Sequence, residues 1–567
     1  MNRTGSHPWW QSAVVYQVYP RSFADSTGNG VGDLTGVRRH LDHLELLGVD
    51  VLWISPVYPS PMADNGYDIS NYCDVDPLFG TLADLDALVA DLHRRGMKLV
   101  MDLVVNHTSD EHPWFEESRS GPDNPKHDWY WWRTTPNNWG SFISGSAWRF
   151  DERRGAYYLH LFARKQPDLN WENPDVRHAV YEMMRWWLDR GIDGFRMDVV
   201  NMISKDPALP DGPVRPGERH GVIGRSVIDG PRVHEYLAEM HREVFDRYDR
   251  DLLLVGETPG VSIEEARNYT DPHRRELDMV FHFEHVRVDR GTSKWDVLPF
   301  DMTRLRDCLA AWQAGLSDVG WNSLYWDNHD QPRVVSRYGD EEHRVESAKL
   351  LATVLHLQRG TPYIYQGDEI GMTNYPFRSI EQFDDIESIN YYHESLALGD
   401  APEAVLGSLR AMSRDNGRTP MQWDDSPHAG FTTGQPWLAV NPHYPDVNAA
   451  AQVEDPDSVF SHYRRLIQLR HELPVVAHGD FTLLASNHDQ LFAYSRRHAG
   501  AELVVVANFS RREAHMADLM HRCRDAELVV GDSTGAWLAP WEARVYLARE
   551  MGDGRTHITG ARPSAMS

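Results

Sequence analysis

The chain of 567 residues is 41% hydrophobic, so it is long enough for one large core and one or two smaller ones. With 57 basic against 84 acidic residues, its formal net charge of −27 disfavours nucleic acid and anionic membrane surfaces, and a neutral small-molecule partner fits better. Trp and Pro interrupt the first residues, and no apolar stretch reaches about eighteen residues, so we expect neither a signal peptide nor a membrane span.

The three cysteines, Cys73, Cys308 and Cys523, are far apart and show no CxxC spacing for zinc or redox chemistry. We therefore expect free thiols in a reducing compartment, which predicts a cytoplasmic protein. Nothing in the sequence sets the number of subunits.

Short β-branched runs, each followed by a helix-like stretch, recur from the N-terminus to about residue 370. The eight runs are Val14–Pro20, Val51–Val57, Leu99–Asn106, Gly194–Val200, Leu252–Glu257, Met279–Glu284, Ser323–Asn328 and Tyr363–Gly367. The repetition is typical of parallel strands joined by crossover helices, and it predicts an α/β fold with a closed (β/α)₈ TIM barrel. An open doubly wound sheet is the alternative, but no GxGxxG follows the first run, and polar residues end many of the runs.

Two segments depart from this repeat. Residues 107–173, after the third run, are rich in Trp, Pro, Asn and Gly and are too long for a plain connection, which predicts an inserted subdomain. From residue 480 the pattern changes to alternating strands, so residues 480–567 predict a C-terminal antiparallel β-sandwich domain. Residues 1–106 and 174–479 then form the barrel.

The fourth run ends in Arg196-Met197-Asp198. Because successive side chains of a strand alternate, Arg196 and Asp198 share a face at the carboxyl end of the strand. The guanidinium is expected to lower the pKa of Asp198 and keep it ionised, as a carboxylate nucleophile requires. A purely structural ion pair is the alternative interpretation.

The fifth run ends in Gly256-Glu257-Thr258, which brings a second carboxylate to the same rim. Retaining glycosidases need two carboxyl groups roughly 5–5.5 Å apart, one ionised for attack and one protonated to release the leaving group. The alternative for Glu257 is a carboxylate that caps a helix N-terminus.

Two histidines occupy equivalent strand ends. The seventh run is followed by His329 and Asp330, and the third run ends in Asn106 and His107. A carboxylate beside an imidazole can bind vicinal hydroxyls of one sugar ring, although a single histidine is more often structural.

Together, these segments closely resemble the conserved regions of the α-amylase superfamily: DLVVNH at 102–107, GFRMD at 194–198, GE at 256–257 and NHD at 328–330. KQPDLNW at 165–171 and SRDNGRTPMQWDDSPHAGF at 413–431 are most similar to its oligo-1,6-glucosidase and α-glucosidase subgroup. The resemblance spans nearly the whole chain and implies a glycoside hydrolase acting on short α-glucosides.

The resemblance implies that Asp198 is the nucleophile, Glu257 the acid/base and Asp330 the transition-state stabiliser. The further contacts that it implies are Asp64, Tyr67, His107, Arg196, His329, Gln166 at the entrance, and an arginine of the RDNGR segment, for which we favour Arg418 over Arg414. An Asp64–Arg418 pair is expected to close the pocket beyond the non-reducing glucose, which predicts exo action on short chains.

Val199, the residue after the expected nucleophile, is a candidate determinant of which glycosidic linkage the protein prefers. In the subgroup that the chain resembles, valine here accompanies α-1,6 preference and threonine α-1,4 preference. A branched apolar side chain cannot hydrogen-bond to a leaving glucose that is joined through a ring hydroxyl. It still leaves room for the narrower CH₂ group through which a 1,6-linked glucose is joined. Simple packing of Val199 against its neighbours is the alternative.

The segment of residues 25–33 alternates oxygen-bearing and small residues and resembles the metal loop of the subgroup. The candidate ligands are Asp25, Thr27, Asn29, Val31 and Asp33. Thr27 and Asn29 stand where relatives often carry Asn and Asp, which lowers the ligand charge. We expect a structural Ca²⁺ or Mg²⁺ and no catalytic cofactor; a glycine-rich turn without an ion is the alternative.

Three other functions remain open. The first is an α-glucosidase that prefers α-1,4 bonds. The second is a sucrose- or trehalose-type glucosyl isomerase, because residues 286–290 read Val-Arg-Val-Asp-Arg where isomaltulose synthases commonly show Arg-Leu-Asp-Arg. The third, an inactive transporter subunit, would need a membrane segment and broken carboxylates, and the sequence shows neither.

Overall fold

The computed structural model describes residues 7–216 and 219–549. Within these residues, eight parallel strands form one sheet in the order β10-β11-β1-β2-β3-β7-β8-β9, and a parallel bridge between Val280 and Asn322 joins its two ends. The strands are β1 Val15–Val18, β2 Val51–Ile54, β3 Lys98–Leu103, β7 Gly194–Met197, β8 Leu253–Glu257, β9 Met279–Phe281, β10 Ser323–Leu324 and β11 Thr361–Tyr365. The predicted TIM barrel is therefore confirmed.

Several strands end earlier than the sequence pattern predicted. The run Ser323–Asn328, for instance, contributes only Ser323–Leu324 to β10 among the described residues. The residues that follow leave the backbone ladder, and Asp327 and Asn328 accept backbone N–H groups of Val334 and Asp330 instead.

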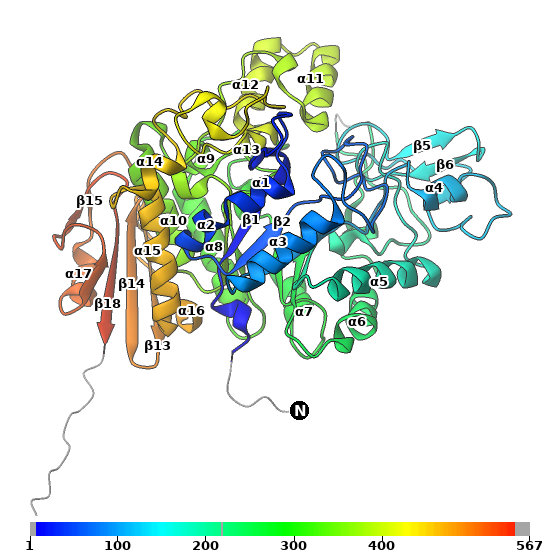
Figure 1. Cartoon of the computed structure of the whole chain (residues 1–567). Coiled ribbons are helices and arrows are strands. Elements are labelled where there is room, and N and C mark those ends of the chain that lie inside the picture. The colour runs from blue at the N-terminus through cyan, green and yellow to red at the C-terminus, as the bar shows by residue number, and fades with distance from the viewer. Residues whose placement is uncertain (1–6, 217–218, 550–567) are drawn as a thin grey trace, which may run out of the picture.

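Helices cover the outside of the barrel (Figure 1). Those of the barrel layer are α1 Leu34–Arg39, α2 Leu41–Leu47, α3 Leu82–Arg94, α5 Pro174–Asp189, α6 Val233–Glu243, α7 Ile263–Thr270, α8 Met302–Gly315, α9 Val334–Tyr338, α10 Arg344–His356 and α15 Val459–Glu472. Their starts follow local chemistry: Thr81 forms a capping box with Asp84 at α3, and Asn173 caps α5, which has proline at its first position.

Gly194 begins β7, the strand that leads to Asp198. Its φ is 155°, and a Cβ at this position would lie 2.0 Å from the carbonyl oxygen of Leu253. Glycine therefore allows β7 and β8 to approach closely, which brings their carboxyl ends together.

The segment after β3 contains the helix α4 (Pro113–Ser118) and an antiparallel sheet of β4 (Trp132–Arg133), β6 (Ala156–Leu159) and β5 (Trp148–Asp151). It projects to the right in Figure 1. A second excursion follows β11 and was not predicted as a separate layer. It contains α11 Ile386–Leu398, α12 Pro402–Met412, α13 Asp415–Arg418 and α14 Ala449–Val453, and its helices α11 and α12 lie at the top of the view.

The C-terminal part is antiparallel, as predicted. In the described chain its main sheet has the order β12-β13-β14-β18-β16, and β15 pairs with β17 beside it. The bounds are β12 Asp480–Leu484, β13 Leu491–His498, β14 Ala501–Asn508, β15 Ala514–His515, β16 Glu527–Val530, β17 Trp537–Leu538 and β18 Ala543–Arg549, with the short helices α16 Pro474–His478 and α17 Met520–Cys523. The domain limits stay a prediction, and residues 550–567 lie outside the described residues.

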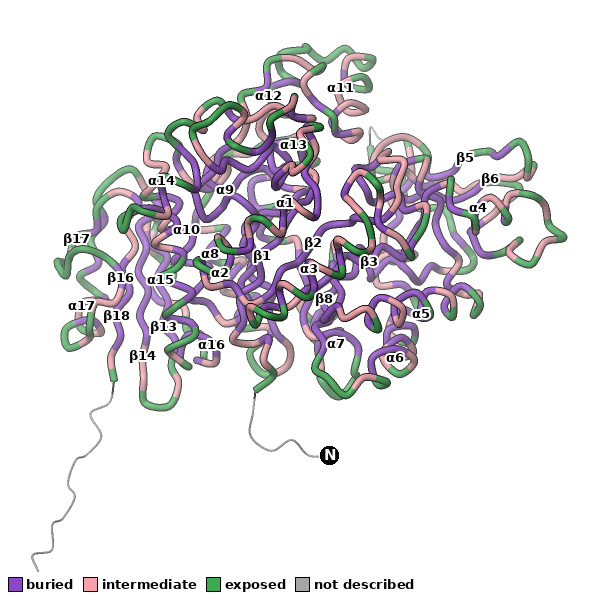
Figure 2. Tube along the Cα trace, in the orientation of Figure 1, coloured by how far each residue is buried: buried purple, intermediate pink, exposed green. Residues whose placement is uncertain are grey.

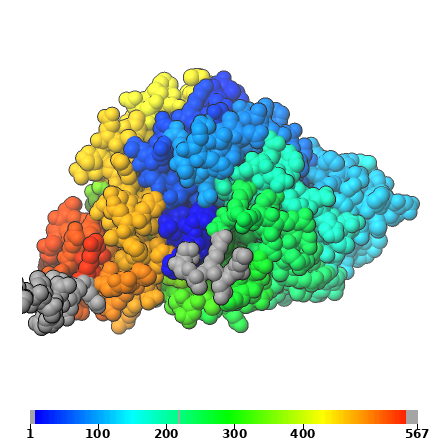
Figure 3. Space-filling view, turned by 60° about the horizontal axis from the view of Figure 1, so that its bottom comes forward, coloured from blue at the N-terminus to red at the C-terminus, as the bar shows by residue number. Residues whose placement is uncertain are grey.

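Burial follows this architecture. Figure 2 shows the barrel strands as buried, whereas the outer turns of the inserted segment and of α11 and α12 are partly exposed. Figure 3 shows the lower end of the molecule, where the blue N-terminal residues lie between the orange C-terminal sheet and the green middle of the chain. None of the helices in residues 7–216 and 219–549 combines the length and the apolar composition of a membrane span.

Candidate active site

A single guanidinium connects three buried carboxylates at the carboxyl ends of β3, β7 and β8. Arg196 Nη1 lies 2.8 Å from Asp102 Oδ1 and 2.8 Å from Asp198 Oδ1, and its Nη2 lies 2.8 Å from Glu257 Oε1. Asp198 is 8% exposed and Glu257 is 6% exposed. The structure thus brings together the two carboxylates that the sequence placed on neighbouring strand ends.

The predicted pKa of Asp198 was wrong in direction. Burial and the neighbouring Glu257 carboxylate raise the pKa of Asp198 well above its usual value and outweigh the lowering by Arg196. Burial likewise raises the pKa of Asp102 to about 6. One cation cannot fully neutralise three carboxylates away from water, which disfavours complete ionisation of this group.

Val199 has a strained backbone, with φ 36° and ψ 40°, which a β-branched residue rarely adopts. In this conformation its N–H donates to Glu257 Oε2 over 3.0 Å. Its side chain is 7% exposed and packs in a cluster with residues of the inserted segment, including Trp131 and Leu159. The residue after Asp198 therefore orients the second carboxylate through its backbone and meets the inserted segment through its side chain.

His329 and Asp330 follow β10, as predicted. His329 Nδ1 pairs with the Gln17 side chain at 2.8 Å, and its ring stacks on Tyr67 with centroids 5.1 Å apart. Burial lowers the pKa of His329 to about 3, so the ring is neutral near pH 7. Burial would raise the pKa of Asp330, but His329, when it is protonated, and Arg414 and Arg418 lower it. With His329 neutral, the two arginines are what keep Asp330 ionised.

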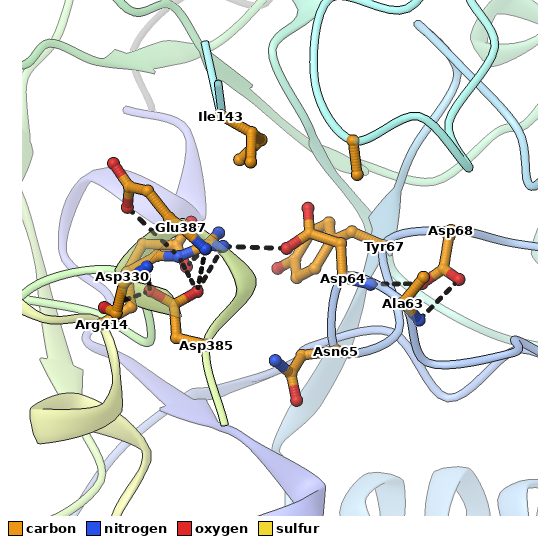
Figure 4. Close-up of polar contacts among 12 residues, drawn as sticks. Ala63, Asp64, Asn65, Tyr67, Asp68, Ile143, Asp330, Asp385, Glu387 and Arg414 are labelled. Carbon is orange, nitrogen blue, oxygen red and sulfur yellow. Dashed lines mark hydrogen bonds and ion pairs between the residues drawn. The ribbon is translucent and has the colours of Figure 1, made fainter. Parts of the chain in front are cut away.

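The expected Asp64–Arg418 pair does not form, and the preference for Arg418 at this place was wrong. Arg414 Nη2 lies 3.0 Å from Asp64 Oδ1, a pairing that Figure 4 shows across the site. Arg418 instead donates to the carbonyl oxygen of His329 and to Asp330 Oδ1, at 2.9 and 2.7 Å. Because Arg418 ends α13 and is fully buried, its side chain reaches behind the His329–Asp330 loop, whereas Arg414, four residues earlier, faces the mouth.

Gln166 does not line the entrance, which corrects a second expectation. It is fully buried, and its Nε2 donates to Asp64 Oδ2 over 3.1 Å. The same amide lies 3.2 Å from His107 Nε2. The chain turns Gln166 inward because its Oε1 accepts the N–H of Ala163, so the residue supports Asp64 and His107 from behind.

Two residues missed in the sequence, Lys205 and Asp168, join the inserted segment to the barrel together with Asn106. Lys205 Nζ is fully buried and lies 2.9 Å from Asn106 Oδ1 and 3.1 Å from Asp168 Oδ1. Asn106 also donates to Asp168 over 2.8 Å. This group fixes the backbone that carries His107. A lysine soon after the GFRMD segment was the available signal, but its partners are distant in sequence.

Asp102 was also missed as a site residue, although it begins the DLVVNH segment. It accepts hydrogen bonds from Tyr67 Oη and Trp53 Nε1 at 3.0 and 3.1 Å, in addition to its contact with Arg196. A carboxylate in the middle of an otherwise apolar strand was the signal for it.

The 25–33 loop satisfies its own polar atoms. The Asp25 carboxylate accepts from Thr27 N, Thr27 Oγ1, Gly28 N, Gly30 N and Thr432 Oγ1, which fills the roughly four lone-pair positions of a carboxylate. Asn29 Oδ1 accepts from Val31 N, and Asp33 Oδ1 caps α1. Within the described chain, no group of three or more His, Cys, Asp or Glu side chains is arranged to hold a metal.

This loop conformation fits a hydrogen-bonded turn better than a cation site. A structural Ca²⁺ or Mg²⁺ stays a prediction, which thermal unfolding with and without added cation after chelation tests. No step below depends on it.

Comparison with known proteins gives consistent results over nearly the full length. The family model described as "Alpha amylase, catalytic domain" matches residues 17–479. An oligo-1,6-glucosidase of Halalkalibacterium halodurans is 53% identical over 566 residues, covering 96% of this chain and 100% of the relative.

Solved structures agree with this. The chain is similar to trehalose-6-phosphate hydrolase of Bacillus licheniformis, with TM-score 0.90, 45% identity, and coverage of 95% of this chain and 100% of that one. It is also similar to the trehalulose synthase MutB of Pseudomonas mesoacidophila MX-45, with TM-score 0.89, 42% identity, and coverage of 96% and 100%.

Proposed function

This chain belongs to the alpha-amylase family of glycoside hydrolases, and on that premise we propose that it is a retaining, exo-acting α-glucosidase of the oligo-1,6-glucosidase type. Its substrates are short, neutral α-glucosides. The observation that carries the proposal is the Arg196 guanidinium, which holds Asp198 and Glu257 on its two terminal nitrogens at adjacent strand ends.

The first displacement needs one ionised and one protonated carboxyl group. A carboxylate oxygen of Asp198 attacks the anomeric carbon while Glu257 gives its proton to the glycosidic oxygen, so the bond to the leaving sugar breaks. Arg196 stays between the two groups and orients both.

The second displacement releases glucose. Glu257, now ionised, accepts a proton from water, which attacks the same carbon and breaks the ester to Asp198. Asp330, held ionised by its two arginines, accepts hydrogen bonds from ring hydroxyls and stabilises the positive charge that develops in each transition state.

The Asp64–Arg414 pair supports exo action. It spans the mouth between the segment after β2 and the start of α13, and Arg414 is only 8% exposed (Figure 4). A glucose whose far side meets this pair has no room for a preceding sugar unit. The bond that is cleaved is therefore the one that follows the non-reducing terminal glucose.

We further propose a cytoplasmic location. The structure contains no disulfide among its described residues, and Cys73, Cys308 and Cys523 are free thiols. A cell fractionation experiment that follows the natural protein tests this.

The function is tested by incubating the protein separately with isomaltose, maltose, sucrose and trehalose and resolving every product. We expect glucose from isomaltose at the highest rate, without new disaccharides as main products. The similarity to trehalulose synthase makes isomerisation the specific alternative, and conversion of sucrose into an isomeric disaccharide would support it instead.

Linkage preference is expected to depend on Val199. Threonine has nearly the same volume and the same β-branching, so Val199→Thr preserves the strained backbone and adds a hydroxyl. We predict that the maltose-to-isomaltose ratio of kcat/KM rises about tenfold, which corresponds to about 1.4 kcal/mol of differential transition-state binding. Steady-state kinetics on both sugars measure this, and an unchanged ratio contradicts the linkage proposal while leaving the glucosidase assignment intact.

A further inference from the structure

Asp385, the residue before α11, is fully buried and belongs to none of the sequence motifs considered above. We propose that Asp385 is a positioning residue, which fixes the two arginines that hold Asp64 and Asp330 and thereby sets recognition of the terminal glucose. The proposal rests on the proposed function and extends it to a residue that does not touch the sugar.

The two oxygens of Asp385 have different partners. Oδ2 accepts from the N–H and the hydroxyl of Ser388, at 3.1 and 2.8 Å, and so caps α11. Oδ1 accepts from Arg414 Nε at 2.8 Å, and Arg414 Nη2 lies 2.6 Å away. One carboxylate therefore ties the start of α11 to the arginine that precedes α13.

Each arginine lies between Asp385 and the carboxylates that face the sugar. Arg414 contacts Asp385 on one side and Asp64 on the other, an arrangement visible in Figure 4. Arg418 Nη1 lies 3.6 Å from Asp385 Oδ1, and its Nη2 lies 2.7 Å from Asp330 Oδ1. A displacement of Asp385 would thus reach both acidic residues that face the sugar.

Charge supports the same role. Burial would raise the pKa of Asp385, but Arg414, Arg418 and Lys294 lower it well below its usual range, so the carboxylate stays ionised. Arg414 and Arg418 both lie near Asp385 and Asp330, so their like charges repel each other. Asp385 supplies the negative charge that lets both cations occupy neighbouring positions away from water.

The substitution Asp385→Asn separates positioning from helix capping. Asparagine is as good an N-cap as aspartate, so α11 keeps its start, but the charge that holds the arginines is lost. Asp301→Asn is the matched control, because Asp301 caps α8 by accepting from Thr303 N at 2.9 Å in an exposed setting.

We expect Asp385→Asn to lower kcat/KM for p-nitrophenyl α-glucoside about 100-fold, the size expected when binding groups move by about 1 Å. Asp301→Asn should stay near the wild-type value. Wild-type kinetics in the Asp385→Asn protein would overturn the proposal.

A double-mutant cycle with Arg414→Gln distinguishes positioning from a general structural effect. If Asp385 acts through the two arginines, only the route through Arg418 remains in the Arg414→Gln background, so adding Asp385→Asn there should lower kcat/KM by about tenfold or less instead of about 100-fold. Full additivity of the two losses would contradict the proposal. Should Asp385→Asn not fold, Ser388→Ala, which removes one donor to Asp385, should give a smaller loss that again shrinks in the Arg414→Gln background.

The aryl glucoside presents a terminal glucose whatever the natural linkage. If the wild-type enzyme cleaves this substrate but the losses in the double-mutant cycle are fully additive, the result contradicts only the proposed positioning role of Asp385. A wild-type protein that cleaves none of the α-glucosides contradicts the proposed function instead.

Discussion

Replacing Asp198 with asparagine is expected to lower kcat by at least about 10⁴-fold, because an amide keeps the shape of the carboxylate but cannot form the glycosyl ester. This loss corresponds to about 5.4 kcal/mol of transition-state stabilisation. The fold should persist, since Arg196 retains Asp102 and Glu257 as partners. Circular dichroism and steady-state hydrolysis of isomaltose measure the two properties.

Asp278→Asn provides the matched control. Asp278 is also a carboxylate beside a barrel strand, but it precedes β9 at the opposite rim and accepts the N–H of Leu254 over 2.8 Å. An asparagine oxygen can accept the same bond, so this variant should keep near-normal activity. Substantial turnover by a verified Asp198→Asn preparation would show that another group attacks the sugar.

Replacing Glu257 with glutamine should separate substrates by their leaving groups. A natural sugar needs a proton to depart, so kcat/KM for isomaltose is expected to fall by about 10²–10⁴-fold. A p-nitrophenolate leaves with little proton donation, so kcat/KM for the aryl glucoside should change far less. The parameter kcat/KM is the informative one because it reports the steps up to cleavage of the glycosidic bond.

The same variant tests the later step. Water attack also needs Glu257, as a base, so the aryl substrate should give a burst of nitrophenol followed by slow turnover. Equal losses of kcat/KM on both substrates would exclude Glu257 as the acid and leave it only a structural role through its contacts with Arg196 and Val199 N.

Much of the fold could be predicted because each barrel unit is local. A β-branched run followed by a helical stretch identifies a strand and its helix, and parallel strands place their carboxyl ends at one rim. Asp198, Glu257 and His329 were therefore located from strand ends before any contact was known. Strand limits were less certain, since the sequence does not show where polar residues such as Asp327 and Asn328 leave the ladder.

The errors concern contacts between distant segments. Arg414 and Arg418 are four residues apart and identical in chemistry, so only packing decides which one meets Asp64 and which one passes behind His329. The sequence predicted a contact of Arg196 with Asp198 alone. In the fold, Asp102 and Glu257 also contact this guanidinium, and the pKa of Asp198 is raised instead of lowered.

The most direct test of the two-carboxylate mechanism is the configuration of the first glucose released. Two displacements at one carbon restore the starting configuration, so NMR within the first minutes of isomaltose hydrolysis should show α-glucose, before mutarotation forms the β-anomer. Early appearance of β-glucose would contradict the account, because it would make Asp198 a base that activates water instead of a nucleophile.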